Sequence, residues 1–372
     1  MDKITQILHC RVDTDGSLPA VTPIFQNSAF RAGSQYFYSR KDNPNVKELE
    51  ELFKILENSK YGLVSTTGMS SIFLILHLLP PNSSLVINQD MYGCSYKLFQ
   101  KYAALFNINL HIKDLSVKKN IDMLSGKFDM IFFETPTNPF LKTIDIAYVS
   151  NKIKSLNKQC LVVVDNTWAT PLYQHPLQLG ADIVMYSATK YFSGHSDVMG
   201  GVITTDNESI DKQLRDLRFY SGSIIEPQSA WLMRRSMQTF SLRMNAQGLT
   251  TLKIVDFLKT CPQIAKVYYP KIDAAQLTNY GTLIFFEFNQ DFHDKYQVFS
   301  KALALFDTGT GMACVTSTVA QPFSGSHASL TELEKTGMGI HQGLVRMSFG
   351  LESPDDLIDD IRQALQAIAD TN

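Results

Sequence analysis

The sequence predicts an α/β protein, with a mostly parallel sheet flanked by helices and a smaller C-terminal α+β domain. Two observations lead to this prediction: short unbroken apolar runs recur through the middle of the chain, and stretches of helical periodicity separate them. Apolar runs without polar alternation are typical of strands buried on both faces. The alternation of strands and helices indicates parallel pairing through right-handed crossovers.

The large sheet is predicted from four apolar runs, at residues 84–88, 129–133, 161–164 and 183–185. Helical patterns occupy residues 46–56, before the first run, and 146–156, between the second and the third. After about Arg243 the pattern changes. Strands are expected there at residues 283–288 and 345–349, and a helix at residues 355–368. We therefore expect three parts: an N-terminal arm (1–40), a large domain (41–243) and a C-terminal domain (244–372).

Composition excludes several classes of protein. The 372 residues are 44% hydrophobic and 19% charged, with a formal net charge of -2, so neither a nucleic-acid partner nor a membrane surface is expected. The five cysteines are scattered without a C-x-x-C pair, which argues against a disulfide framework and against a metal site. The N-terminus lacks a long apolar stretch, and the apolar run 72–80 is too short to cross a bilayer. We expect a cytoplasmic protein.

Polar residues follow each predicted strand of the large sheet. In an open parallel sheet, ligands bind beyond the carboxyl ends of the strands. The residues that should converge there are 90–92, 134–139, 165–167 and 187–190. This convergence is the main functional inference from the pattern.

Lys190 and Asp165 follow neighbouring predicted strands. A lysine at a sheet edge loses part of its solvation, which favours the neutral amine that attacks an aldehyde. A carboxylate such as that of Asp165 could face the pyridine nitrogen of pyridoxal 5'-phosphate (PLP) and keep it protonated. Alone, the lysine would be interpreted as a surface residue and the aspartate as a turn or helix cap. Together they favour a PLP site.

An anion site is predicted at the segment STTGMS, residues 65–70, which precedes the apolar run 72–79. A glycine-containing turn that opens a helix presents free backbone N–H groups and the positive end of the helix dipole. An ordinary helix N-cap is the alternative interpretation. The segment is not a P-loop, because the G-x-x-x-x-G-K pattern is absent.

Eight motifs occur in order along nearly the whole chain: AVTPIF (20–25), YFYSRKDNPN (36–45), STTGMSSI (65–72), DMYGCS (90–95), ETPTNP (134–139), VVDNTWATP (163–171), SATKYFSGHSDVMGG (187–201) and LVRMSFGLESPDDLIDDI (344–361). With them the chain resembles the Cys/Met-metabolism PLP-dependent enzymes. This group contains cystathionine γ-synthase, cystathionine β- and γ-lyases, methionine γ-lyase and O-acylhomoserine sulfhydrylases. The resemblance implies the PLP-dependent transferase fold type I, which is aspartate aminotransferase-like. It also implies that the arm contacts a neighbouring subunit, the large domain binds PLP, and the C-terminal domain grips the substrate.

The resemblance implies a role for each matching position in the PLP site. Lys190 would form the Schiff base and later shuttle a proton, and Asp165 would pair with the pyridinium. The phosphate would be bound by Ser187, Thr189 and the backbone of Gly68 and Met69.

Five further positions receive roles from the resemblance. Tyr92 would stack on the cofactor ring and assist acid–base chemistry, and Asn138 would face the 3'-oxygen of the ring. Tyr38 and Arg40 would reach the phosphate of a neighbouring subunit, and Arg346 would grip the substrate α-carboxylate. Without the resemblance, Tyr92 could be a core aromatic residue, Arg346 a surface ion-pair partner, and Tyr38 and Arg40 part of a solvated loop.

Two segments depart from the family pattern and put the substrate in doubt. Where the family commonly has Ser-Leu-Gly-Gly followed by Glu-Ser, this chain has TGTGMAC at residues 308–314, with Thr308 as a candidate substrate-binding residue. A few apparently extra residues precede Pro322, and the acidic residue often seen in γ-acting members is not evident. Cys94 resembles the methionine γ-lyase pattern, with a buried structural thiol as the alternative.

The expected activity is γ-replacement or γ-elimination on cystathionine, O-acylhomoserine or related sulfur amino acids. Methionine γ-lyase, cystathionine β-lyase and O-acylhomoserine sulfhydrylase activities remain alternatives. The arm residues imply a homo-oligomer, as a dimer of dimers (homotetramer). A nicotinamide dehydrogenase is disfavoured because no G-x-G-x-x-G follows the first predicted strand. A non-catalytic relative is disfavoured because both Lys190 and Asp165 are present.

Overall fold

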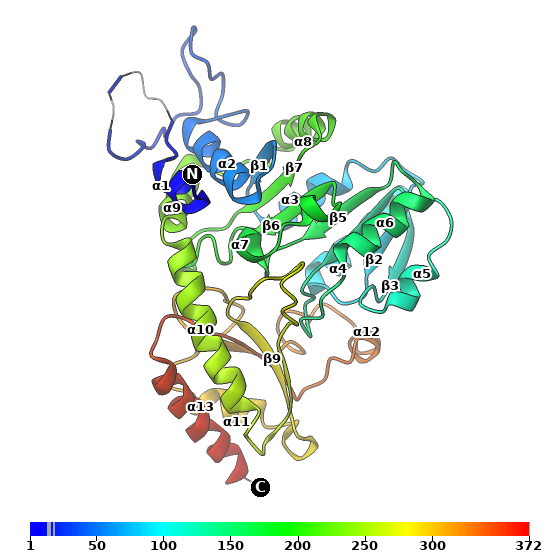
Figure 1. Ribbon diagram of the computed structural model, residues 1–372, viewed down its shortest axis with the longest axis vertical. Helices are drawn as coiled ribbons and strands as arrows, with labels where there is room; N and C mark the ends of the chain where they lie inside the picture. Colours follow the sequence, from blue (N-terminus) through cyan, green and yellow to red (C-terminus); the bar gives the residue numbers. More distant parts are fainter. Residues whose placement is uncertain (13–15, 18, 372) are drawn as a thin grey trace.

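The computed structural model describes residues 1–12, 16–17 and 19–371, and it contains two sheets (Figure 1). The larger sheet has the strand order β1-β7-β6-β5-β4-β2-β3. Its strands are β1 (Tyr61–Ser65), β2 (Ser84–Asn88), β3 (Asn109–Lys113), β4 (Met130–Glu134), β5 (Leu161–Asp165), β6 (Ile183–Ser187) and β7 (Gly201–Thr205). All pairs are parallel except those that β7 makes with β1 and β6.

The prediction of a mostly parallel sheet is confirmed. The four predicted strands are β2, β4, β5 and β6, and their bounds differ from the prediction by at most two residues at either end. These strands were recognisable because they are buried almost throughout. The sequence pattern missed β1, β3 and β7. β3, at the edge of the sheet, is only half-buried and carries a mixed polar and apolar sequence.

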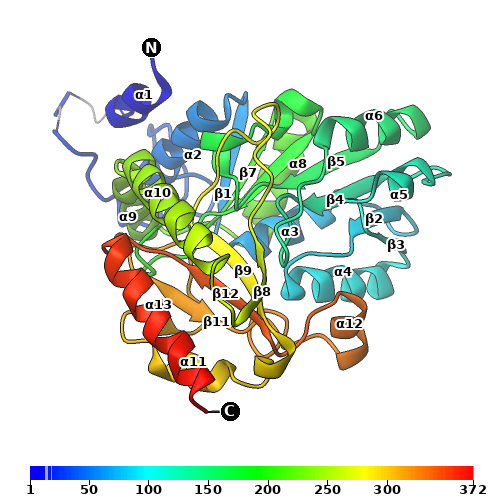
Figure 2. The same ribbon diagram turned by 60° about the horizontal axis from the view of Figure 1, so that its bottom comes forward.

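Helices cover both faces of this sheet (Figures 1 and 2). The predicted helices are confirmed within α2 and α6, and the apolar run 72–79 begins in α3. The helices and 3₁₀ turn of this part are α1 (Lys3–His9), α2 (Pro44–Glu57), α3 (Gly68–Leu76), α4 (Gly93–Phe106), α5 (Lys118–Asp122), α6 (Ile146–Leu156), α7 (Thr170–Tyr173), η1 (Pro176–Leu179), α8 (Glu208–Ser221) and α9 (Pro227–Met237).

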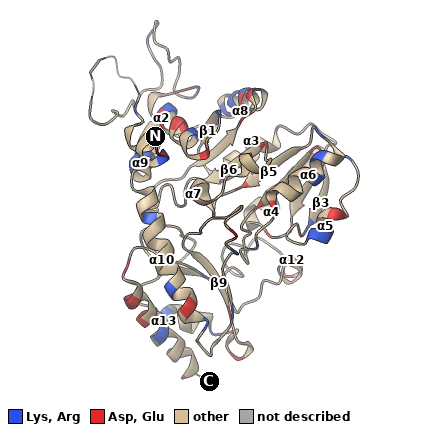
Figure 3. Ribbon diagram, viewed as in Figure 1, with Lys and Arg blue, Asp and Glu red and all other residues tan. Residues whose placement is uncertain are grey.

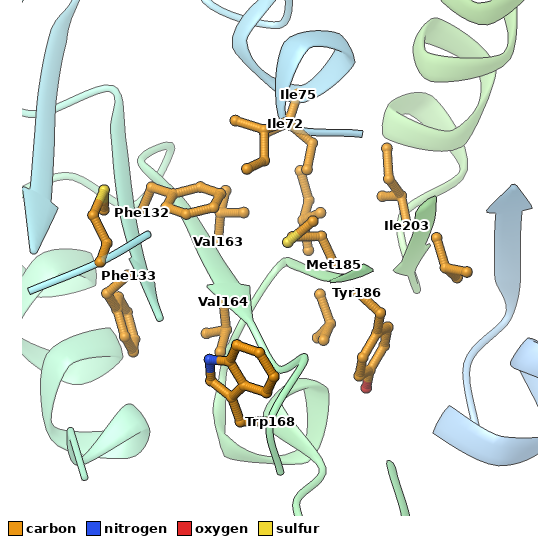
Figure 4. Packing of buried hydrophobic residues seen from close by; sticks show 14 of the residues in the cluster. Ile72, Ile75, Phe132, Phe133, Val163, Val164, Trp168, Met185, Tyr186 and Ile203 are labelled. Atoms are coloured by element: carbon orange, nitrogen blue, oxygen red, sulfur yellow. The ribbon is translucent and has the colours of Figure 1, made fainter. Parts of the chain in front are cut away.

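Side chains in the core around the central strands of the larger sheet point alternately to its two faces. Figure 4 shows Ile72 and Ile75 of α3 lying against one face of the sheet, next to Val163 and Met185. The following residue of β5, Val164, points to the opposite face, where Trp168 packs. The strand ends that carry polar residues are therefore held by apolar packing on both sides.

The smaller sheet has the order β10-β11-β12-β9-β8. Its strands are β8 (Ile264–Tyr268), β9 (Leu283–Phe288), β10 (Asp307–Thr308), β11 (Thr318–Ala320) and β12 (Leu344–Ser348), and the associated helical elements are η2 (Gln290–Phe292), α11 (Tyr296–Ala302), α12 (Glu332–Gly337) and α13 (Pro354–Ala369). Both predicted C-terminal strands and the closing helix are confirmed as β9, β12 and α13, whereas β8, β10 and β11 were not predicted. Figure 2 shows α10 (Phe240–Leu258) and α13 packed over this sheet.

The predicted boundary between residues 243 and 244 falls near the start of α10, which continues from the large part into the small one. The division into three domains remains a prediction. In the described part of the chain, no helix combines the length and apolar character needed to cross a membrane. Acidic and basic residues are interspersed over the helices (Figure 3).

A buried ion pair fixes β1 against its neighbours. The Glu50 carboxylate of α2 forms ion pairs with Arg218 of α8 at 2.6 Å and with Arg215 at 3.0 Å. Arg218 also donates a hydrogen bond to the Val64 carbonyl at 2.8 Å. Burial alone would raise the pKa of Glu50, but the charges of Arg218 and Arg215 outweigh it and lower that pKa. The carboxylate therefore stays ionised inside the protein.

Removing one partner of this buried pair should be strongly destabilising. We expect E50A to lower the free energy of unfolding by about 3–5 kcal/mol, because it leaves buried guanidinium charge without a counter-ion. Urea unfolding at pH 7 measures this change. The exposed pair between Lys212 and Glu208 is the control, and K212A should leave the unfolding midpoint nearly unchanged. Equal midpoints for E50A and wild type would contradict the expectation.

Candidate active site

The carboxyl ends of β4, β5 and β6 open into a cavity of about 350 Å³. Most of the predicted site residues line it: Gly68, Met69, Tyr92, Asn138, Asp165, Ser187, Thr189 and Lys190. A second cavity of about 540 Å³ shares Lys190, Met199 and Met312 with the first and extends toward Glu226 and Thr310. The predicted convergence at one sheet edge is therefore present in the structure.

Lys190 lies in the loop between β6 and β7. This loop is closed by hydrogen bonds between Thr189 and Gly200, with the Gly200 N–H donating to the Thr189 hydroxyl at 3.1 Å. Burial, and then the charge of Arg346, lowers the pKa of Lys190 from 10.5 to about 8. The amine lines both cavities and makes no hydrogen bond or ion pair within the described part of the chain. The neutral, nucleophilic form of the amine is therefore more populated near neutral pH than in a solvated lysine.

Asp165 ends β5, one strand away from the strand that leads to Lys190. One of its oxygens, Oδ1, accepts hydrogen bonds from the backbone N–H of Thr167 at 3.0 Å and from its hydroxyl at 2.5 Å. Burial raises the pKa of Asp165 to about 6, although these hydrogen bonds act in the opposite direction. A cationic ring nitrogen in the cavity would favour the ionised form of this carboxyl group.

Glu134 is a second buried carboxyl group, to which the sequence interpretation gave no role. It is 3% exposed, and its Cα is the register partner of Asp165 across β4 and β5. Its two oxygens accept from the backbone N–H of Tyr92, at 3.1 Å, and from the indole N–H of Trp168. Burial and the neighbouring Asp165 raise the pKa of Glu134 well above its usual range. Only its place at a predicted strand end could have indicated it.

The N-terminus of α3 forms the side of the cavity suited to a phosphate. Thr67 caps the helix by accepting from the Ser70 N–H at 3.0 Å, so the alternative of an ordinary N-cap holds as well. A Cβ on Gly68 would lie 2.9 Å from the Cβ of Ser187, so only glycine lets the helix approach β6 this closely. The free N–H groups at the helix start, with Ser187 and Thr189, form a site for an anion.

Tyr92 and Asn138 complete the cavity wall. Burial raises the pKa of Tyr92 to about 12, and the adjacent Cys94 adds to this shift, so the phenol keeps its proton. Tyr92 lines the cavity and is not a core aromatic residue. Asn138 is 1% exposed, and within the described residues its Oδ1 has no hydrogen-bond partner. Cys94 is exposed, so the alternative of a buried structural thiol is wrong.

Arg346 lies in β12 and is 2% exposed. Its Nη2 donates to the Thr310 carbonyl at 3.4 Å, and its Nη1 has no partner among the described residues. The alternative of a surface ion pair is therefore wrong. Burial lowers the pKa of Arg346 to about 10, and a buried cation with an unused donor is suited to binding a carboxylate.

Four predicted residues are not among the lining residues of either cavity: Arg346, described above, and Thr308, Tyr38 and Arg40. Thr308 is exposed in β10, and Thr310, Gly311 and Met312 of the same segment line the second cavity instead. The substrate-binding role of Thr308 remains a prediction, and the structure does not place this residue at either cavity. The arm residues Tyr38 and Arg40 do not line the cavities of their own chain. Arg40 donates to the Phe219 carbonyl at 2.7 Å and lies 4.5 Å from the centroid of the Phe219 ring.

No cluster of His, Cys, Asp and Glu suited to a metal ion occurs within residues 1–12, 16–17 and 19–371. The cavity instead combines an amine that ionises near neutral pH, a carboxyl group on the next strand and a helix N-terminus suited to phosphate. These groups fit an aldehyde, a pyridine nitrogen and a phosphate, which together define a PLP-dependent enzyme.

The chain belongs to the Cys/Met metabolism PLP-dependent enzymes, whose family model matches residues 5–366. It is 35% identical to the cystathionine β-lyase of Lactococcus lactis, over 97% of this chain and 98% of that protein. It is 33% identical to the cystathionine γ-lyase of Bacillus subtilis, over 99% and 100%. The cofactor prediction, PLP, is confirmed by the family.

Solved structures confirm the predicted fold class. Cystathionine γ-synthase from Xanthomonas oryzae pv. oryzae, in complex with cystathionine, superposes with a TM-score of 0.95 at 30% identity, with 100% of both chains covered. Cystathionine γ-lyase from Lactobacillus plantarum, complexed with L-serine, gives a TM-score of 0.93 at 30% identity, covering 99% of this chain and 100% of that one. This chain therefore has the α/β fold of these PLP-dependent enzymes.

Burial of Lys190 should destabilise the cofactor-free protein while the amine is protonated. The pKa of Lys190 falls from 10.5 to about 8 on folding. Between these two pH values the unfolded chain binds more protons than the folded protein, so the free energy of unfolding rises with pH in that range. The free energy of unfolding of K190M should therefore exceed that of wild type by about 3 kcal/mol at pH 7. The two proteins should differ little at pH 11. Urea unfolding of both cofactor-free proteins measures this. A pH-independent difference would contradict the burial argument.

Proposed function

We propose that this enzyme breaks or forms the bond between sulfur and the γ-carbon of cystathionine, by γ-elimination or by γ-replacement on an O-acylhomoserine. The observation on which the proposal depends is the neighbourhood of Lys190 and Arg346. The guanidinium is close enough to lower the pKa of the amine; Arg346 is buried, and Lys190 is half-buried at the cavity wall. A substrate carboxylate bound by Arg346 would place the adjacent α-carbon near the Lys190 amine.

The residues of the cavity divide the chemical tasks. PLP, when bound through Asp165, Asn138 and the phosphate site, supplies the electron withdrawal that makes the protons of the substrate acidic. Arg346 orients the α-carboxylate through a bidentate pair, which uses the free Nη1. The Lys190 amine is placed to remove the α-proton. Once it has released that proton and is neutral again, it can remove a proton from the β-carbon, which γ-chemistry also requires.

Tyr92 is suited to the leaving group. Its phenol keeps its proton because its pKa is about 12, and it stands at the cavity wall beside Asn138. A thiolate that leaves the substrate can take a proton from such a hydroxyl group. The backbone N–H of Tyr92 is held by Glu134, so the position of the turn that carries the phenol is fixed.

β-Elimination is the second candidate function. It is favoured by the 35% identity to a cystathionine β-lyase over nearly the whole chain. The same amine, arginine and phenol would serve it, because only the bond that breaks differs. The ketoacid product separates the two: γ-elimination from cystathionine yields 2-oxobutyrate and cysteine, whereas β-elimination yields pyruvate and homocysteine.

The decisive assay incubates the PLP-loaded protein with cystathionine, and separately with an O-acylhomoserine plus cysteine. We expect 2-oxobutyrate from the first mixture or cystathionine from the second. R346K should lower kcat/KM on the order of 100-fold, because the loss of a charge-assisted bidentate pair costs about 3 kcal/mol. K190A is the inactive control. Pyruvate as the sole ketoacid would establish the β-lyase activity instead.

We also propose that the site is shared between subunits, because Tyr38 and Arg40 lie on an arm outside the cavities of their own chain. A homo-oligomer, assembled as a dimer of dimers, would let this arm reach the phosphate end of a neighbouring site. R40A should weaken PLP binding without removing visible absorption at saturating cofactor, and light scattering should show an oligomer. A fully active monomer would contradict the proposal.

A further inference from the structure

His327 is a buried residue that the chemistry described above does not use. It lies between β11 and α12 and is 0% exposed. Its Nε2 is 3.2 Å from the carbonyl oxygen of Met91, the residue before Tyr92, and the backbone of Asn138 is close enough to the ring to act on its pKa. One imidazole therefore contacts the backbone at two positions that adjoin or line the cavity.

The hydrogen bonds of His327 define its tautomer. A carbonyl oxygen can only accept, so Nε2 carries the hydrogen. Nδ1 is then the acceptor, and the hydroxyl of Ser326 donates to it at 2.9 Å. Burial lowers the pKa of His327 to about 4, so the ring is neutral and keeps both sets of bonds at neutral pH. The residue is thus built to hold a position and not to transfer protons.

Gly93 provides independent evidence for a close contact. A Cβ at this position would lie 2.8 Å from the carbonyl oxygen of Ser326 and 3.2 Å from the Cα of His327. The absence of a side chain immediately after Tyr92 therefore lets the segment that carries His327 pack against the start of α4. This close contact explains why position 93, in the DMYGCS motif, is occupied by glycine.

We propose that His327 is a positioning residue that holds Tyr92 and Asn138 in register with Arg346. β11 leads into the His327 segment and pairs with β12, where Ala320 is the register partner of Arg346. The strand that grips the substrate carboxylate is thereby connected to the two residues that contact the cofactor ring. The part of this inference that concerns substrate rests on the proposed function. The part that concerns cofactor geometry does not.

The test compares three variants with a matched control. H327L fills similar space without a donor, H327Q keeps an N–H donor, and S326A removes only the hydroxyl that fixes the tautomer. H293Q is the control, because His293 also contacts a backbone carbonyl, that of Phe288 at 3.0 Å, but does not line either cavity. For each protein the visible circular dichroism of bound PLP, the PLP dissociation constant, and kcat and KM for cystathionine are measured.

We expect H327L to halve the visible circular dichroism or more and to lower kcat by about tenfold or more, since small misplacements of reacting groups are costly. H327Q should recover most of both signals, S326A should show a smaller change in the same direction, and H293Q should match wild type. If H327L does not fold, the circular dichroism and kcat of S326A and H327Q can still be compared with those of wild type and H293Q.

A lower unfolding temperature with unchanged circular dichroism and kcat would show a merely structural role and would overturn the inference. Equal effects in H327Q and H327L would also overturn it, because the donor would then be irrelevant. If wild type neither releases 2-oxobutyrate from cystathionine nor forms cystathionine from an O-acylhomoserine and cysteine, the proposed function fails. The circular dichroism and PLP affinity of the variants nevertheless still test His327.

Discussion

Desolvation of the Lys190 amine at the carboxyl end of β6 is the constraint on which the rest of the site depends. An amine held near Arg346 in a buried cavity is forced toward its neutral form, and only that form reacts with an aldehyde. The surrounding structure must supply the stability that this burial removes. Apolar packing on both faces of β5 and β6, and the charge pairs buried beneath β1, provide that support.

The cavity is polarised along its length. Asp165 and Glu134 place two carboxyl groups at one side, where repulsion and burial allow only one of them to ionise easily. The N-terminus of α3 supplies positive potential elsewhere on the wall, and the charge of Arg346 acts on Lys190 from nearby. A cofactor with a basic nitrogen and a phosphate, bound next to an amino-acid carboxylate, matches this separation of charge. The distribution of charge therefore favours the binding of such a cofactor and substrate, independently of the reaction.

The sequence revealed the parts of the fold and site that depend on local pattern. Strands buried on both faces, such as β4 and β5, were recognisable, and Asp165 and Asn138, at or beyond their carboxyl ends, both line the cavity. β3 and β7 escaped because one is half-exposed and the other begins with glycine, without a long apolar run. His327 and Glu134 were missed because their significance depends on partners distant in the chain, Met91 and Trp168 among them. Thr308 lines neither cavity, whereas Thr310 of the same segment does, because spacing alone does not define which residues of a loop face inward.

The antiparallel strand β7 has an evolutionary consequence. Because β7 returns directly beside β6, with Ser187 opposite Gly201, the reactive lysine sits in a hairpin-like connection whose two ends are both anchored in the sheet. Connections through a crossover helix can lengthen or shorten at their ends, whereas this one cannot gain or lose a residue without displacing the amine. Insertions and deletions should therefore be rare in residues 188–200 and should concentrate in connections far from the sheet edge.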